Sequence, residues 1–513
     1  MSMEFLLGID IGTSGTKTVL FDIFGNTIAN ASIEYPLYQP EFGWAEQEPE
    51  DWWQATITSI QQVIQKSGVS SEYIRSIGLS GQMHGMVLLN KECNVLRSSI
   101  IWCDQRTREQ CDHITALVGK DRLIEITANP ALTGFTASKV MWVKEKQPEI
   151  FDNIYKVLLP KDYIRYKLTG EFATEVSDAS GTQFLDIPNR IWSHEVLNHL
   201  GIPKEWMPQV YESQVITGEI TAQIAKITGL KEGTAVVGGG GDQAAGAIGN
   251  GIVKTGAISS TIGTSGVVFA YTDTVKIDPK GRVHTFCHAI PNTWHIMGVT
   301  QSAGLSLKWM RDQFCGMEKE IGNFLNIDPY VLISQEAERA DPGCDGLIYL
   351  PYLMGERTPH LDPYAKGVFF GLSAKHRRQD MIRSVLEGVT YSLLDCLSII
   401  RGLGVTITEV RASGGGARSE LWRQIQADMF STDITTINSS EGPALGAALL
   451  AGVGVGIYSD VSQACESTIK LLDTQKPIYK NVKLYSQYYR VYKGLYLALK
   501  PSFDEISRIN QSC

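Results

Sequence analysis

The sequence predicts an α/β protein built from two related domains. The pentapeptide IGTSG occurs at residues 11–15 and again at residues 262–266, near the start of each half of the 513-residue chain. An apolar stretch typical of a strand lies on each side of both copies, which predicts one strand–turn–strand unit per half. Because 513 residues exceed what one ordinary core accommodates, two or more domains are expected. Two related α/β domains would leave a cleft between them for a ligand.

The first half is predicted to begin with a meander of strands and a helix. The strands are expected over 5–10, 17–22 and 27–35. A helix is expected over 49–68, where Pro49 suits the first turn and one face is apolar through Trp53, Ile57, Ile60 and Ile64. Further strands are expected over 74–80 and 98–102, and the polar loops GQMHG and CDQRTR follow them.

The pattern restarts near residue 235. A short strand, four glycines, an Asp and a helix of small residues are expected over 234–249, and the second strand–IGTSG–strand unit covers 256–271. A long amphipathic helix over 380–400 precedes a strand, a triple glycine and a helix over 410–430. Two more helices complete the prediction: a buried one over 444–458 that Pro443 opens, and a closing one over 485–499 whose tyrosines belong to the core.

Charge and cysteine content exclude several classes of protein. The net charge is -9 and no run of Lys and Arg occurs, which argues against nucleic acid or an anionic membrane as a partner. The nine cysteines are widely spaced and form no C-x-x-C, so reduced thiols in a cytoplasmic protein are expected. The N-terminal MSMEFLLGIDIG lacks a basic segment and contains Asp10, so no signal peptide is expected.

The glycine turns are suited to hold phosphate. A tight Gly-Thr-Ser-Gly turn presents several backbone N–H groups and two hydroxyls at one point, and glycine lets an oxyanion approach closely. For one copy a plain hairpin turn is the better interpretation, but two copies favour a shared ligand. The first copy is no P-loop, because Thr16 stands where that motif needs glycine and a strand follows instead of a helix.

Two aspartates stand beside these glycine segments. Asp10 ends the strand before the first turn, and Thr261 occupies the same place before the second. A carboxylate next to a phosphate needs a cation between them, which predicts Mg²⁺ at Asp10, with a turn-capping role as the alternative. Asp242, in GGGGDQ, is suited to take a proton from a hydroxyl that attacks a γ-phosphoryl group, with helix capping as the alternative.

Four segments resemble those of the FGGY family of carbohydrate kinases, over nearly the whole chain. GIDIGTSGTK at 8–17 is similar to the family's first phosphate hairpin and GGGGDQAAGA at 238–247 to its catalytic Asp segment. STIGTSG at 260–266 is similar to its second phosphate loop, and SGGGARSELWRQIQAD at 413–428 to its adenosine-binding segment. The resemblance implies two actin-like ATPase (ribonuclease H-like) domains with a catalytic cleft between them. Their expected bounds are 1–248 and 252–485, followed by a helix and tail over 486–513.

Within the family, SGQMHG, LLPKDY, SDASGT and GERTPH resemble the xylulokinases. This implies ATP and D-xylulose as substrates with Mg²⁺, and it leaves a homodimer open. Asp242 would be the base, Asp10 would hold Mg²⁺, and the sugar would contact Met83, His84 and Gln243. The nucleotide would contact the two turns and the later glycine segments through Thr13, Ser14, Gly15, Lys17, Thr264, Gly304, Gly415, Gly416 and Ser419.

Several alternatives stay open at this point. Asp104 and Arg106 either bind sugar hydroxyls or pair with each other. Cys103 and Gln243 stand where many xylulokinases have asparagine, which leaves a sibling kinase for another ketose, a polyol or gluconate as an alternative. An actin-like ATPase that clamps a protein, and an inactive sugar sensor, are the alternatives from other classes. The presence of Asp10, Asp242 and the Met83-His84 pair favours a sugar kinase over both.

Overall fold

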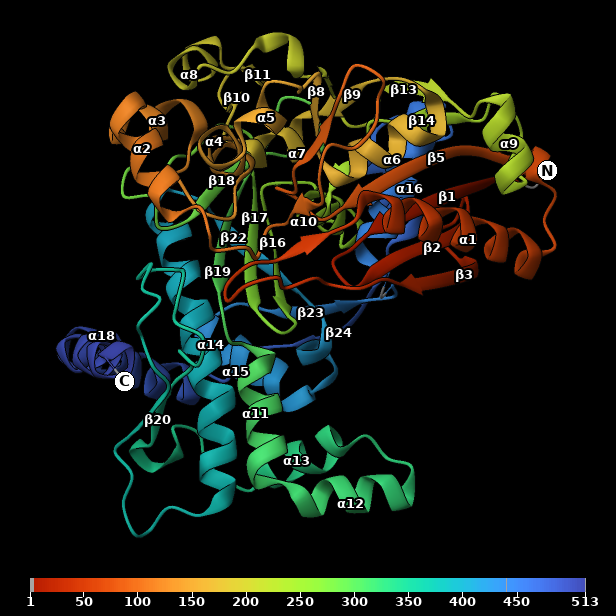
Figure 1. Cartoon of the computed structure of the whole chain (residues 1–513). Coiled ribbons are helices and arrows are strands. Elements are labelled where there is room, and N and C mark those ends of the chain that lie inside the picture. The colour runs from red at the N-terminus through yellow and green to blue at the C-terminus, as the bar shows by residue number, and fades with distance from the viewer. Residues whose placement is uncertain (1–3, 440, 513) are drawn as a thin grey trace.

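Two mixed β-sheets form the framework of the chain. The computed structural model describes residues 4–439 and 441–512, so that residues 1–3 and 513, at the outer ends of the predicted domains, lie outside it. Each sheet has seven strands within the described residues. Figure 1 shows the first sheet in the upper body and the second running down through the middle of the molecule. The predicted α/β class is confirmed.

The first sheet contains the predicted N-terminal meander. Six of its strands run in the order β13-β14-β5-β1-β2-β3, and the seventh, β15 (Gly240–Gly241), pairs with β5 beside this path. Their bounds are β1 Phe5–Ile11, β2 Gly15–Asp22, β3 Thr27–Glu34, β5 Ile74–Gly81, β13 Ile216–Glu219 and β14 Ala235–Val237. β1 pairs antiparallel with β2 and parallel with β5. Helix α1 (Pro49–Ser67) packs on this sheet through Trp53 and Ile60, which lie in one core with Leu7 and Ile9.

The second sheet repeats this arrangement strand by strand. Its order is β18-β19-β17-β16-β22-β23-β24. The bounds are β16 Gly256–Ile262, β17 Gly266–Thr272, β18 His284–Cys287, β19 Trp294–Thr300, β22 Ile407–Ser413, β23 Ile434–Ile437 and β24 Leu471–Gln475. β16 pairs antiparallel with β17 and parallel with β22, as β1 does with β2 and β5. The edge pair β23–β24 is antiparallel, like β14–β13. The duplication therefore extends well beyond the IGTSG turns that reveal it in the sequence.

Helix α16 (Gly442–Gly454) comes from the second half of the chain but packs on the first sheet. Glycines on two strands allow this contact: a Cβ on Gly8 would lie 2.0 Å from the Ala444 carbonyl oxygen, and one on Gly78 would lie 1.8 Å from that of Ala447. Any side chain there would push the helix off the sheet. The apolar segment predicted as a buried helix thus joins the two halves by packing on the first sheet.

Helix α10 (Asp242–Gly249) makes the reciprocal contact with the second sheet. Its Ala247 lies in one cluster with Ala257, Phe269 and Tyr271 of β16 and β17. The two exchanged helices also touch each other, since a Cβ on Gly446 would lie 1.8 Å from the Ala245 carbonyl oxygen. Because α10 begins at Asp242, this exchange places that carboxylate at the boundary between the halves.

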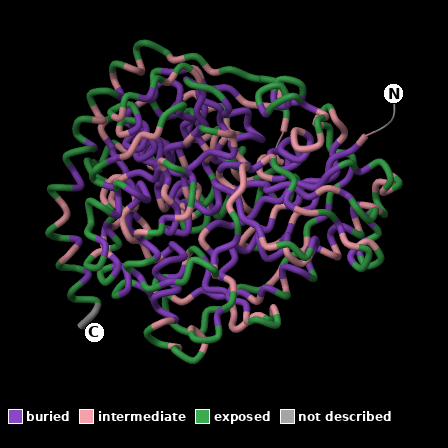
Figure 2. The backbone as a smooth tube through the Cα atoms, turned by 90° about the horizontal axis from the view of Figure 1, so that it is seen from above, coloured by how far each residue is buried: buried purple, intermediate pink, exposed green. Residues whose placement is uncertain are grey.

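The remaining elements cover the sheets and extend each half. In the first half they include α2 Arg108–Val118, α3 Lys120–Thr127, α4 Thr136–Lys146, α6 Pro160–Thr169, α7 Val176–Ala179, α8 His194–Leu200, α9 Ala222–Thr228, β6 Val87–Leu89, β8 Lys156–Leu158, β9 Ala173–Glu175 and β15 Gly240–Gly241. In the second half they include α11 Gly304–Phe314, α12 Gly316–Leu325, α13 Pro329–Ala337, α14 Arg378–Gly402, α15 Glu420–Phe430, α17 Val461–Thr468, α18 Tyr479–Ser512, β20 Ile348–Leu350 and β21 Val368–Phe370. Figure 2 shows the buried backbone running through the interior, with exposed segments around it.

The predicted elements are present, with three changes of length. The buried helix predicted over 444–458 spans Gly442–Gly454. The closing helix α18 is longer than predicted, and Tyr485 and Tyr492 are buried in the core as expected. The strand expected over 98–102 is reduced to β7 (Ser99–Ile100), which pairs with β4 (Glu46–Gln47). The eight cysteines within the described residues are all free. Over the same residues, no helix combines the length and apolarity needed to cross a membrane.

Candidate active site

The first glycine turn, between β1 and β2, is fixed by side chains around it. The Gly12 N–H donates to the Gly15 carbonyl over 3.0 Å. Gln47 Nε2 donates to the Thr13 carbonyl over 2.7 Å, and Trp102 Nε1 donates to Thr13 Oγ1 over 2.9 Å. These bonds fix the turn through the carbonyls of Thr13 and Gly15 and the hydroxyl of Thr13. Thr13, Ser14 and Gly15, the predicted phosphate contacts, all lie in this turn.

The second glycine turn, between β16 and β17, is fixed by backbone groups of α11. The N–H groups of Gly304 and Leu305 donate to the carbonyls of Gly263 and Thr264 over 2.8 Å and 3.1 Å. Gly304 has to be glycine here, because a Cβ would lie 2.3 Å from the Gly263 carbonyl oxygen. The predicted contacts Thr264 and Gly304 are therefore neighbours, although forty residues separate them in the sequence.

Asp10 lies at the end of β1, directly before the first turn. Within the described residues its buried Oδ1 accepts no hydrogen bond, and no bond from the turn reaches its carboxylate, so it does not cap the turn. Burial raises the pKa of Asp10 to about 6, while the neighbouring Ser80 hydroxyl and the charge of Lys17 act in the opposite direction. A buried carboxylate oxygen without a partner suits a cation.

Asp242 is the first residue of α10. Gly241 holds the cap position, so the helix-capping alternative for the Asp242 side chain is not what the structure shows. Burial raises the pKa of Asp242 to about 7, and the negative charge of Asp10 adds to this effect. The two carboxylates are thus close enough to disfavour simultaneous ionisation without a cation. A base whose pKa lies near neutral pH is well matched to proton transfer.

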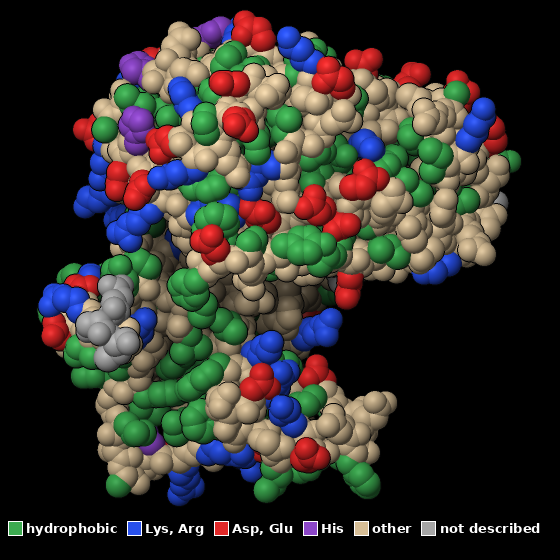
Figure 3. All heavy atoms as spheres, in the orientation of Figure 1, with side chains coloured by type: hydrophobic (Ala, Val, Ile, Leu, Met, Phe, Trp, Pro, Cys, Tyr) green, Lys and Arg blue, Asp and Glu red, His purple; other side chains and the backbone are tan. Residues whose placement is uncertain are grey.

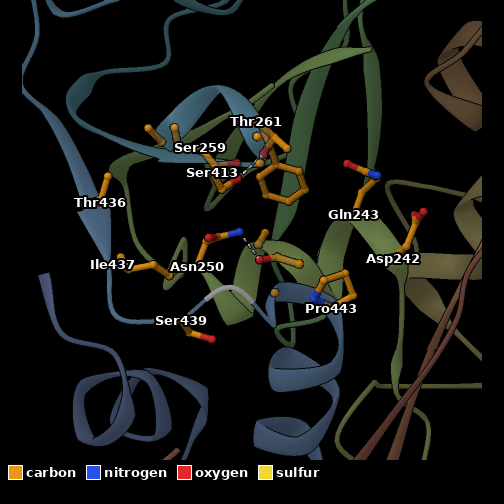
Figure 4. Close-up of a pocket in the computed structure, with 18 of the residues that line it drawn as sticks. Asp242, Gln243, Asn250, Ser259, Thr261, Ser413, Thr436, Ile437, Ser439 and Pro443 are labelled. Atoms are coloured by element: carbon orange, nitrogen blue, oxygen red, sulfur yellow. Dashed lines mark hydrogen bonds between the residues drawn. The ribbon is translucent and has the colours of Figure 1, made fainter. Parts of the chain in front are cut away.

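Asp242 stands at the edge of a cavity of about 530 Å³ between the two halves. Figure 4 shows Asp242 and Gln243 at one side of it, Thr261, Ser259 and Ser413 above, and Thr436 and Ile437 opposite. Thr261 and Ser413 share a hydrogen bond of 2.7 Å between their hydroxyls. Asn250 Nδ2 donates to the Gly246 carbonyl over 2.8 Å. The lining is rich in hydroxyl and backbone groups, as a site for phosphate requires.

A second cavity, of about 590 Å³, adjoins the first. The predicted contacts Thr264, Gly304, Gly415, Gly416 and Ser419 all line it, together with Tyr330 and Val331 of α13. Gly415 and Arg418 line both cavities, so the two spaces meet at the triple-glycine segment. Figure 3 shows the surface hollowed between the upper body and the lower arm, which carries α12 and α13 in Figure 1. A long ligand with a phosphate tail would fit the two cavities end to end.

Met83 and His84 lie close to the glycine segment that precedes Asp242. Met83 packs with Phe135 from the first half and with Phe286 and Val299 from the second. Its side chain also underlies the catalytic segment, because a Cβ on Gly241 would lie 2.9 Å from Met83 Cγ. The ring of His84 stacks on Phe135 with 4.6 Å between the ring centroids. The predicted sugar residues are therefore next to the predicted base.

His84 has a strained backbone that its surroundings maintain. Its φ is 70°, a value that side chains other than glycine rarely adopt. The His84 carbonyl accepts hydrogen bonds from Thr136 Oγ1 over 3.0 Å and from Lys139 Nζ over 2.9 Å. Lys139 is fully buried, and burial lowers its pKa to about 7. Two donors from α4 thus hold this carbonyl and fix where the imidazole points.

Asp104 and Arg106 form a buried ion pair. Arg106 Nη2 lies 2.7 Å from Asp104 Oδ2, and both side chains are almost completely inaccessible. Arg106 also donates to Glu46 over 2.6 Å and stacks over Trp44. Asp104 Oδ2 accepts a further bond from the Ala45 N–H over 2.6 Å. Of the two interpretations, pairing with each other is the one that the structure favours over binding of sugar hydroxyls.

A buried charged network supports the glycine segment that precedes Asp242. Lys161, in the LLPKDY segment, donates to the Gly238 carbonyl over 3.3 Å and lies 3.6 Å from Asp178. Ser177, in the SDASGT segment, accepts a bond of 3.1 Å from the Gly241 N–H. The two segments that resemble xylulokinases thus position the backbone before Asp242. Sequence reasoning singled out these segments without assigning this role, because the contacts join residues far apart in the chain.

Lys17 is paired with the other half of the chain. Its Nζ lies 2.5 Å from Glu441 Oε2, immediately before α16. Its predicted contact with phosphate would require it to exchange this partner. Sequence reasoning did not find Glu441, nor the hydroxyl groups of Ser259 and Ser413 in the cavity wall. The glycine segments indicate that this part of the chain binds a ligand. Their spacing does not indicate which hydroxyl groups point into the cavity.

The donor set at Asp10 and Asp242 fits a magnesium ion that phosphate oxygens and water share. Two carboxylates near each other, one with an oxygen that lacks a partner, favour a hard divalent cation. Within the described residues, no group of three or more His, Cys, Asp and Glu side chains is arranged to hold a metal. Magnesium would therefore be held by Asp10 together with a nucleotide, rather than in a cage of protein ligands.

Comparisons with known proteins agree with this geometry. Residues 5–249 match the N-terminal domain of the FGGY family of carbohydrate kinases, and residues 258–455 match its C-terminal domain. The chain is 40% identical over 498 residues to a xylulose kinase of Bacillus subtilis, covering 97% of this chain and 98% of that protein. It is 33% identical to a gluconokinase of Bacillus licheniformis, covering 99% of both. The crystal structure of a xylulose kinase from Brucella ovis superposes with a TM-score of 0.88 at 36% identity, covering 97% of this chain and 100% of that one. The chain belongs to the FGGY family of carbohydrate kinases.

Proposed function

We propose that the protein transfers the γ-phosphoryl group of ATP to the 5-hydroxyl of D-xylulose, with Asp242 as the general base. One observation carries the proposal: Asp242 lines a cavity bounded by glycine segments of both halves, and Gly241, directly before it, lies against Met83. The similarity to xylulose kinases over almost the whole chain supports D-xylulose as the sugar.

The protein's part in the reaction is positioning and proton transfer. Asp242 takes the proton of the sugar hydroxyl as its oxygen attacks the γ-phosphorus, and the bond from that phosphorus to the bridging oxygen of ADP breaks. The pKa of about 7 makes Asp242 a stronger base than an exposed carboxylate while leaving it largely ionised just above neutral pH. Lys161 and Ser177 hold the backbone before Asp242 in place behind the site.

The nucleotide lies along the two adjoining cavities. The adenosine occupies the space lined by Ser334, Gly416 and Ser419, and the phosphates reach the two glycine turns. Asp10 would hold Mg²⁺, and the ion would neutralise charge on the phosphates of the nucleotide. We also propose that the halves, about residues 1–248 and 252–485, close on both substrates and exclude water.

A sugar acid such as gluconate is the second candidate substrate. Two observations favour gluconate as the alternative: the similarity to a gluconokinase over 99% of both chains, and the presence of Gln243 next to Asp242. Gln243 has the donors and acceptor of asparagine on a longer side chain, which narrows the space near the reacting hydroxyl.

Coupled measurement of ADP release over a panel of pentuloses, polyols and gluconate tests the proposal. D-Xylulose is expected to give the highest kcat/KM, and phosphorus NMR of the product is expected to place the phosphate on C5. A higher kcat/KM for gluconate or another sugar would refute D-xylulose as the substrate and leave the assignment to the family intact.

A further inference from the structure

Arg357, from the second half of the chain, lies beside the predicted sugar residues. It belongs to the GERTPH segment between β20 and β21, which sequence reasoning noted but gave no role. The next residue, Thr358, donates its N–H to the Val299 carbonyl over 3.0 Å and accepts the Val299 N–H over 3.2 Å. Val299 packs against Met83 in the cluster that contains Phe135. The hydrogen-bonded contact with β19 therefore places Arg357 next to this cluster.

The guanidinium of Arg357 donates no hydrogen bond within the described residues, although the charge of Glu356 acts on it. No acceptor among residues 4–439 and 441–512 takes a hydrogen bond from it, although the side chain is half-buried. The carboxylate of the neighbouring Glu356 accepts none of these donors, because four other groups already bond to it: Thr300 Oγ1, the Gln301 N–H, Ser392 Oγ and the backbone N–H of Arg357. The five N–H donors of this half-buried guanidinium are therefore available to a ligand that supplies acceptors.

His84 faces the same region as an acceptor. Its Nδ1 lies 2.7 Å from the Gly181 carbonyl and must carry the proton that bonds to this oxygen, so Nε2 is left with a free lone pair. Burial lowers the pKa of His84 to about 3, and the positive charges of Lys139 and Arg357 act in the same direction. The imidazole is therefore neutral, and no hydrogen bond joins its free nitrogen to Arg357 within the described residues.

A hydroxyl group can connect these two side chains. It donates its proton to an imidazole nitrogen and accepts from a guanidinium with its lone pairs, whereas water is a poor substitute in a site that closes. A polyhydroxylated sugar offers such groups on adjacent carbons. The geometry points to a new assignment: Arg357 is a sugar-binding residue that donates to an oxygen of the sugar held by His84.

This assignment rests on the proposed function and adds to it. Phe286, Met297 and Val299 already bring the second half to the edge of the sugar site, but they offer only apolar surface. Arg357 supplies a polar contact from that half, so that binding of the sugar requires both halves. A hydrogen bond from a charged donor is worth enough to raise the dissociation constant roughly tenfold or more when it is lost.

Three variants test the role of Arg357: Arg357→Met, Arg357→Lys and Arg282→Met. Arg282 is a matched control, because its carbonyl accepts from Thr358 Oγ1 while its guanidinium pairs with Asp278. Arg357→Met is expected to raise the KM for D-xylulose, and the dissociation constant from calorimetry without nucleotide, by about tenfold or more. The KM for ATP is expected to stay within about twofold, and Arg357→Lys is expected to recover part of the loss. Arg282→Met is expected to keep the wild-type KM for the sugar.

An unchanged sugar dissociation constant in Arg357→Met would overturn the inference, and so would an equal loss for ATP. If Arg357→Met fails to fold, as judged by circular dichroism, Arg357→Lys and Arg357→Gln decide by the same criteria. If the wild-type enzyme does not phosphorylate D-xylulose, the proposed function fails on its own. The variants are then measured with the best sugar of the panel, and a sugar dissociation constant equal to that of the wild type again refutes the role of Arg357.

Discussion

The two copies of IGTSG have the same five residues but form different turns. In the first, Ile11 pairs with Thr16, and the N–H of Gly12 donates to Gly15. In the second, Ile262 pairs with Gly266, and the N–H of Gly263 donates to Ser265. The second loop is therefore one residue shorter. Identical sequence does not determine the turn, because the flanking strands and the groups that bond to the turn differ.

The surroundings also give the turns different chemistry. The first turn follows Asp10, and side chains of its own half bond to the carbonyl and the hydroxyl of Thr13. The second follows Thr261, whose hydroxyl bonds to Ser413, and the backbone of α11 holds its carbonyls. The first turn thus suits a metal-bound phosphate, and the second suits phosphate without a carboxylate nearby. Both sheets thus have a glycine turn suited to phosphate, but only the first turn has a carboxylate, that of Asp10, directly before it.

The largest effect is expected from Asp242→Asn. This substitution keeps the shape of the side chain but removes its ability to accept a proton. If Asp242 in the first half is the base, kcat should fall by about 10²–10⁴. The KM values for ATP and sugar should change little, which steady-state kinetics of ADP release can establish. A variant with the melting temperature of the wild type and more than a tenth of its kcat would contradict the role of Asp242.

Asp10→Asn and Thr261→Val compare the two turns directly. Asp10→Asn should lower kcat roughly 100-fold at limiting Mg²⁺ and raise the Mg²⁺ concentration needed for half-maximal rate, because the carboxylate is lost. Thr261→Val removes one hydroxyl bond, worth about 1 kcal/mol, and should change kcat less than tenfold. Magnesium titrations of both variants measure this difference. Equal shifts in the magnesium requirement would mean that the turns are not distinct in function.

Sequence reasoning locates the segments of the site but not their contacts. The glycine turns, Asp10 and Asp242 were recognisable because glycine, strand and carboxylate follow one another at short spacing. The exchange of α10 and α16 was not, because it depends on Gly8 and Gly78 lying beneath a helix more than 350 residues later in the chain. The contact of Lys139 with the His84 carbonyl could not be predicted for the same reason, nor could the position of Arg357 near His84. Periodicity reports which face of an element is buried, whereas partners from distant segments follow only from the packed fold.

A smaller effect is expected when Gly304, which packs against the second turn, is replaced by alanine. Gly304→Ala places a Cβ 2.3 Å from the Gly263 carbonyl oxygen, so α11 or the turn must move. We expect the KM for ATP to rise about tenfold and the melting temperature to fall, since overpacking typically costs about 1–3 kcal/mol. Gly263→Ala is the matched control, because its Cβ would meet no atom closer than 3.8 Å. It should keep the wild-type melting temperature, and a loss of stability equal to that of Gly304→Ala would count against this view of the second turn.

The smallest effect concerns the ion pair that ties the first turn's strand to the second half. Lys17 and Glu441 are 38% and 15% exposed, so their pairing should stabilise the fold by at most about 1 kcal/mol. If Lys17 leaves Glu441 to meet phosphate, Lys17→Met should raise the KM for ATP several-fold, whereas Glu441→Gln should lower it or leave it unchanged, because it frees the ammonium group. Urea unfolding and ATP kinetics of both variants separate the two roles. Equal increases in the KM for ATP would show that the pair acts only as a tether between the halves, and the first turn would then bind phosphate through its backbone alone.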